Sequence, residues 1–164
     1  MTITDSPIMQ TAWVIADIDA TEKFFTKHFG VKSWVRLTDV HFPPETCTYR
    51  GEPADFTIHV SLAYLGEMQL ELIQPVRGES IYAEHLRAHG GGLHHVCMVP
   101  ADFEAALAAA EANGVAIAQR GSMADGAMHF AYVDGTDVGV PFIELARLEP
   151  MMVDFFASIR EQTS

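Results

Sequence analysis

The sequence has little positive charge. Its 164 residues include 10 lysines and arginines against 22 aspartates and glutamates, which gives a formal net charge of −12 and an isoelectric point near 4.9. No lysine follows Lys32. Binding to nucleic-acid phosphates without regard to base sequence needs a basic protein surface, so the composition disfavours nucleic acid as a partner. Any anionic ligand must be held by the few arginines or by a metal ion.

Cysteine and long apolar runs are also scarce. The two cysteines are Cys47 and Cys97, whereas small secreted domains usually depend on several disulfides. No apolar run reaches the roughly 18 residues that a helix needs to cross a bilayer. Residues 1–9 lack the basic start and apolar stretch of a secretion signal. We expect a soluble, cytoplasmic protein with two unpaired thiols and no membrane partner.

The composition is otherwise that of a globular chain, with 49% hydrophobic and 20% charged residues. The length fits one domain or two very small fused halves. Hydrophobic periodicity predicts strands at 9–16, 31–38, 56–64, 68–74, 93–100, 115–119, 128–133 and 140–147. It predicts helices at 20–29, 80–89, 101–113 and 150–160. Residues 41–53, rich in turn signals, and the glycine-rich 121–126 are expected to be irregular loops that shape a substrate site.

The order of elements repeats within the chain. The segment 9–17 aligns with 94–102, and each is followed by a predicted helix that ends in Gly-Val. Near the close of each half, 69–72 aligns with 142–145. The sequence therefore predicts an α+β fold of two βαβββ modules, residues 1–89 and 90–148, which form a cupped mixed sheet around a central site. Residues 149–164 are expected to add a C-terminal helix within one structural domain.

Four polar residues occupy equivalent places in this repeat. Gln10 and His95 stand in the two first strands, and Glu71 and Glu144 stand in the two last strands. A carboxylate within an apolar strand is costly to bury unless it is paired or binds a metal. One amide oxygen, one imidazole and two carboxylates suit Zn, Ni, Co, Mn or Fe with open positions. Each glutamate taken alone could instead face solvent, and the repeat register leaves the adjacent His94 as a packing or surface residue.

These segments resemble the vicinal oxygen chelate superfamily, which includes glyoxalase I, methylmalonyl-CoA epimerase, extradiol dioxygenases and bleomycin-resistance proteins. The resemblance is carried by GGLHHV at 91–96, by Asp17 and Asp102 after the first strands, and by the closing ELIQP and IELAR segments. It implies paired modules around a divalent metal, with one ligand from the first and one from the last strand of each module. The residues at those four places are Gln10, Glu71, His95 and Glu144.

The four predicted metal ligands can be compared with those of the different branches of the superfamily. Non-haem iron oxygenases use two histidines and a carboxylate, so Gln10 disfavours dioxygenase activity. The set is similar to that of some glyoxalase I enzymes, whereas the region around GLHHV looks more like methylmalonyl-CoA epimerase. The epimerase pattern has histidine at the Gln10 position, glutamine at the Glu71 position and a second glutamate base. His59 stands near the place of that base, as a second base or as a half-buried strand residue.

The chemistry shared by these branches is proton abstraction next to a carbonyl, with a metal stabilising the enolate. The resemblance thus implies a metal-dependent lyase, isomerase or epimerase acting on a small carbonyl or thioester substrate. Glu144 is the first candidate for the base and Glu71 the second. The alternative is a metal-free, bleomycin-resistance-like protein that sequesters a ligand. We also expect a homodimer, with 151–159 as an interface, a lid or simple packing on its own domain.

Overall fold

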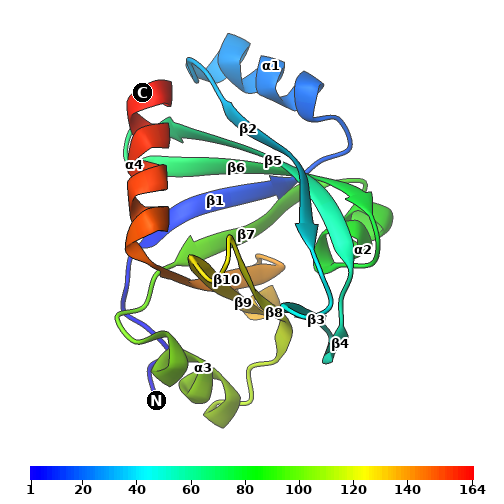
Figure 1. Ribbon diagram of the computed structural model, residues 1–164, viewed down its shortest axis with the longest axis vertical. Coiled ribbons are helices and arrows are strands. Elements are labelled where there is room, and N and C mark those ends of the chain that lie inside the picture. Colours follow the sequence, from blue (N-terminus) through cyan, green and yellow to red (C-terminus); the bar gives the residue numbers. More distant parts are fainter.

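The computed structural model describes residues 1–164 and contains one mixed sheet with four α-helices packed around it (Figure 1). The first part of the chain forms β1 (Ile8–Val14), α1 (Ile18–Phe29), β2 (Val35–Phe42), β3 (Cys47–Tyr49), β4 (Glu52–Pro53), β5 (Phe56–Leu65), β6 (Met68–Arg77) and α2 (Ile81–His89). The second part forms β7 (Gly92–Met98), α3 (Phe103–Ala112), β8 (Ile117–Met123), β9 (Met128–Asp134), a 3-10 turn (Thr136–Val138), β10 (Phe142–Leu148) and α4 (Pro150–Thr163). The predicted α+β fold is confirmed.

The sheet has ten strands in the order β2-β5-β6-β1-β7-β10-β9-β8-β3-β4. Strands β1 and β7 pair antiparallel at its middle, and each has the last strand of its own half as its parallel neighbour on the other side. Gln10 lies opposite Gln69 in one parallel pair, and His95 lies opposite Phe142 in the other. The sequence repeat equates Gln10 with His95 and Gln69 with Phe142, so both halves use the same register. The division of the chain at residues 89 and 148 stays a prediction.

Equivalent aspartates start the helices that follow β1 and β7. The side chain of Asp17 accepts a hydrogen bond from the backbone N–H of Ala20, and Asp102 accepts one from Ala105. An N-cap carboxylate satisfies one of the amide groups that a helix start leaves unpaired. Asp17 and Asp102 therefore set the same strand-to-helix turn in both halves, and this directs the helices to the outside of the sheet (Figure 1).

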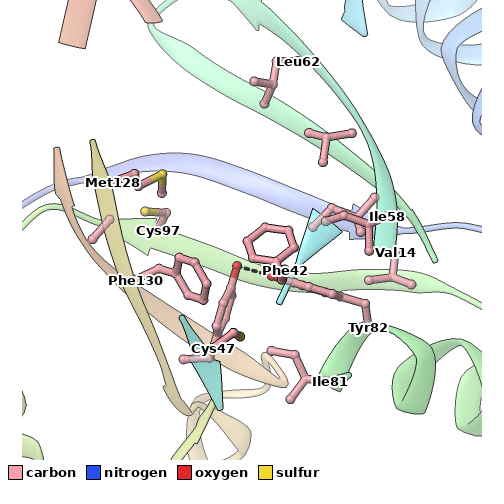
Figure 2. Packing of buried hydrophobic residues seen from close by; sticks show 14 of the residues in the cluster. Val14, Phe42, Cys47, Ile58, Leu62, Ile81, Tyr82, Cys97, Met128 and Phe130 are labelled. Carbon is pink, nitrogen blue, oxygen red and sulfur yellow. Dashed lines mark hydrogen bonds between the residues drawn. The ribbon is translucent and has the colours of Figure 1, made fainter. Parts of the chain in front are cut away.

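The main core lies on the inner face, between the two halves of the sheet. Phe42 stacks on Phe56 with ring centroids 4.8 Å apart, and its edge meets Phe130 of β9 at 5.6 Å. Figure 2 shows the rings of Phe42 and Phe130 near Tyr82, whose hydroxyl is hydrogen-bonded to that of Tyr132 at 2.6 Å. Helix α4 packs against β5, β2 and β10, so it bridges the two halves. None of the helices is long and apolar enough to span a bilayer.

Three predicted segments need correction. Residues 121–126 are irregular only in part, because β8 continues to Met123. The strand expected at 31–38 begins only at Val35 and continues to Phe42, because Gly30 ends α1 in a left-handed conformation and Val31 packs into a small core of its own. Residues 41–53 are not wholly irregular, because they contain the end of β2 and the short strands β3 and β4. Strand β3 pairs with β8 of the other half, a long-range contact that local turn signals conceal. Cys47 and Cys97 are buried free thiols, as expected.

Candidate metal centre

The four central strands bring the predicted ligands to the inner face of the sheet. The Nε2 atom of His95 lies 3.3 Å from Oε2 of Glu71 and 3.2 Å from Oε2 of Glu144. The ligand atoms of these three residues all lie within 4.8 Å of one another. Two ligands that each lie about 2.1 Å from one metal ion are separated by about 3.0–3.4 Å when they are neighbours around it. The observed spacings are therefore compatible with neighbouring ligands of one ion.

Gln10 faces the same cavity as Glu71 and Glu144. Its amide nitrogen donates to Oε1 of Gln69, whose own amide donates to the Tyr64 hydroxyl. This chain fixes the amide and leaves Oε1 of Gln10 buried without a hydrogen-bond partner. Buried polar atoms are almost always partnered, so an unpaired oxygen on the cavity that Glu71 and Glu144 also line fits a divalent cation.

Charge in the group is unbalanced because two carboxylates share one imidazole. Burial would lower the pKa of His95, but the adjacent carboxylates of Glu144 and Glu71 raise it to about 9. Burial raises the pKa of the Glu71 carboxyl, and His95 opposes that rise. His95 and Glu144 are nearly inaccessible to solvent, whereas the Glu71 side chain is 15% exposed. A cation at this place would offset the excess negative charge in surroundings of low polarity.

His94 supplies no atom to the group but contacts it from behind. Its Nδ1 lies 2.9 Å from Nδ1 of His95. Burial against Tyr82, His85 and Phe142 lowers the pKa of His94 well below its usual range, so its ring is neutral. Its Nδ1 can therefore accept the Nδ1–H of His95, which holds Nε2 of His95 toward the carboxylates, where it carries a proton at neutral pH and would offer its lone pair only to a bound metal. The contact of His94 with His95 and that of Gln10 with Gln69 were not predicted, because no sequence pattern indicates either contact.

His59 is not brought to the group. Strand alternation turns Ile58, Val60 and Leu62 into the cavity and His59 to the opposite face of β5. There its Nδ1 accepts the backbone N–H of Asp39 at 3.0 Å. The structure therefore gives His59 no path to a substrate at Glu71 and Glu144, and we leave it out of the proposed site.

The cavity in front of the carboxylates is about 60 Å³, and its walls come from both halves and from α4. Its hydrophobic lining residues are Leu37, Phe42, Ile58, Val60, Leu62, Ile73, Tyr82, Met123, Met128, Phe130, Tyr132, Met152, Phe155 and Phe156. The three other lining residues are Gln10, Glu71 and Glu144. A largely apolar cavity with a few convergent polar groups is typical of a small-molecule site.

Taken together, fold and site define a paired βαβββ protein with a candidate metal group between its halves. Residues 9–132 match the family model described as Glyoxalase/Bleomycin resistance protein/Dioxygenase superfamily. The chain belongs to this superfamily.

Solved structures with the same fold include methylmalonyl-CoA epimerase from Mycobacterium tuberculosis, with 15% identity, a TM-score of 0.63 and coverage of 94% of this chain and 95% of that one. A hypothetical protein from Bacillus halodurans has 17% identity, a TM-score of 0.63 and coverage of 87% and 94%. A Streptomyces coelicolor methylmalonyl-CoA epimerase variant in complex with 2-nitronate-propionyl-CoA has 20% identity, a TM-score of 0.60 and coverage of 90% and 96%. No curated protein matches the chain.

Proposed function

We propose that the protein is a divalent-metal-dependent isomerase, epimerase or lyase that abstracts a proton next to a carbonyl group. The observation that carries this proposal is the group of Glu71, His95 and Glu144, with the bare Oε1 of Gln10 facing the same cavity. Glutamates that faced solvent would not converge on a buried histidine in this way. Zn, Ni, Co, Mn and Fe all accept this donor set.

In this proposal Gln10, Glu71, His95 and Glu144 hold the metal, which when bound supplies Lewis-acid stabilisation of a developing enolate oxygen. Glu144 takes the α-proton, and the electron pair of the broken C–H bond moves into the enolate. Return of a proton to the same carbon or to its neighbour completes epimerisation or isomerisation. Glu71 is the second candidate for the base. The apolar walls exclude water and so preserve the enolate until the proton returns.

The test combines metal analysis with isotope exchange. The purified protein is expected to contain or take up about one divalent metal ion per chain. Metal-loaded protein in D2O should then catalyse α-deuteration of an uncharged ketone such as 2-hydroxyacetophenone, or of methylmalonyl-CoA, and a chelator should abolish the exchange. Protein that takes up no metal yet binds apolar ligands would contradict the proposal and favour a metal-free sequestering protein.

Replacing His94 by phenylalanine is expected to weaken metal binding about 10–100-fold, because His95 loses the acceptor that orients its ring. His94→Asn should restore part of the affinity, since an amide oxygen can replace Nδ1 as the acceptor. Isothermal titration of metal into metal-free protein measures both changes. His85→Phe is the matched control, because His85 is also buried but does not touch His95. Equal losses in all three variants would argue against an orienting role.

A further inference from the structure

The cavity provides no positive charge to a substrate. Its only charged or amide-bearing residues are the candidate ligands Gln10, Glu71 and Glu144, and no lysine, arginine or histidine lines it. The two tyrosine hydroxyls at its wall, Tyr82 and Tyr132, are bonded to each other. Figure 2 shows apolar side chains from both halves, among them Leu62, Ile58 and Met128, around the same interior space.

The lysines and arginines of the chain lie elsewhere, and the arginines are already paired. Every arginine contacts a carboxylate: Arg36 with Asp19 and Glu22, Arg50 with Glu84, Arg77 with Asp55, Arg87 with Glu79, Arg120 with Glu104, Arg147 with Glu149 and Arg160 with Glu67. The three lysines, at 23, 27 and 32, are exposed on α1 or just after it. Exposed ion pairs are weak and can exchange partners, so the decisive fact is that none of these cations reaches the cavity.

A carboxylated substrate would meet an unfavourable environment in this cavity. Its charge would leave water for an apolar enclosure and lie near two carboxylates that already share His95, with no cationic side chain among the lining residues to compensate. The metal proposed above would neutralise only the oxygen held beside its ligands. A group placed farther along, against Leu37, Phe130 or Phe156, is surrounded by hydrocarbon.

We propose that the substrate is an uncharged carbonyl compound with an apolar body, aromatic or branched aliphatic, and not a carboxylated acyl-CoA. This inference rests on the proposed function and names the substrate class of the same site. It separates this chain from the solved structures of similar fold that are complexes with 2-nitronate-propionyl-CoA or methylmalonyl-CoA. The apolar body displaces water from the walls, and the carbonyl oxygen faces the ligand group.

Two hydroxamates that differ in one ring substituent, a neutral methyl group or a charged carboxylate, provide the test. 4-Methylbenzohydroxamate and 4-carboxybenzohydroxamate carry the same chelating head on rings of similar size. Isothermal titration into metal-loaded protein is expected to show the methyl compound binding about tenfold or more tightly, because the carboxylate loses its hydration without a partner. Equal or tighter binding of the carboxy compound, or no binding of either, would overturn the assigned substrate class. Failure of the protein to take up metal, measured first, would instead overturn the proposed function.

A substitution that places a positive charge in the cavity wall provides a second test, and the same substitution at an exposed neighbour is its control. Leu37 lines the cavity on β2, whereas the next residue, Thr38, is exposed. Leu37→Arg should reduce the preference for the methyl compound about tenfold or reverse it, while Thr38→Arg should leave the preference unchanged. Circular dichroism establishes that both variants are folded. An unchanged preference in folded Leu37→Arg protein would count against the inference.

Discussion

Replacing Glu144 by glutamine is expected to slow α-proton exchange about 10²–10⁴-fold, because the amide cannot accept the proton that the carboxylate takes. Glutamine keeps the size of the side chain and an oxygen that can still face a metal, so the core should remain packed. The rate is measured by deuterium incorporation into 2-hydroxyacetophenone in D2O, and metal content is measured on the same sample. A large loss of rate with metal still bound would assign Glu144 to proton transfer and not only to metal binding.

The variant to compare with Glu144→Gln is Glu71→Gln, because Glu71 supplies the other carboxylate at Nε2 of His95. If Glu71 only holds the metal, this variant should lose metal affinity and recover most of its rate at saturating metal. A control outside the site is Glu149→Gln, because Glu149 lies just beyond β10 and forms an exposed ion pair with Arg147. Wild-type exchange by Glu144→Gln protein, with exchange lost in Glu71→Gln protein, would reverse the two roles.

Replacing Phe56 by alanine is expected to lower the free energy of unfolding by about 3–5 kcal/mol, because it removes a fully buried ring and leaves a cavity. The ring of Phe56 has no solvent exposure, stacks on Phe42 and meets the ring of Tyr82 at 5.8 Å. Natural domains have about 5–15 kcal/mol of stability in total, so this variant should unfold at much lower urea concentration.

Phe24→Ala is the control for that experiment. Phe24 is also aromatic, but it lies on α1 and is 52% exposed. Its loss should change the unfolding free energy by less than about 1 kcal/mol. Similar urea midpoints for the two variants would show that the stacked rings between the halves contribute little to stability.

The α+β fold and the membership of the superfamily could be predicted because both rest on local patterns that occur twice. Strand alternation, the aspartates that start the helices, and the Gly-Val that ends each one recur at matching places in the two halves. The four candidate ligands were named for the same reason, since Glu71 and Glu144 interrupt apolar strands at equivalent positions.

What could not be predicted depends on contacts across the sheet. His59 was linked to the site because it stands near the place of the second base in the epimerase pattern, but the face of the strand on which it lies is decided by alternation. Its neighbours Thr57 and Ser61 were the available signal, because polar residues two positions away on either side indicate the face opposite the cavity. The pairing of β3 with β8 joins residues about 70 positions apart, Thr48 with Arg120 for example, and leaves no local trace.

That pairing also has a consequence for how the protein is made. Strand β3 belongs to the first half of the chain, yet its partner β8 emerges from the ribosome only after residue 117. Strands β3 and β4 can therefore pair only with each other while α2, β7 and α3 are synthesised. The early half can collapse on β5 and β6 during this interval, but its β3–β4 arm can close only when the late half arrives. Docking of this arm on the sheet is thus tied to the synthesis of the second half of the chain.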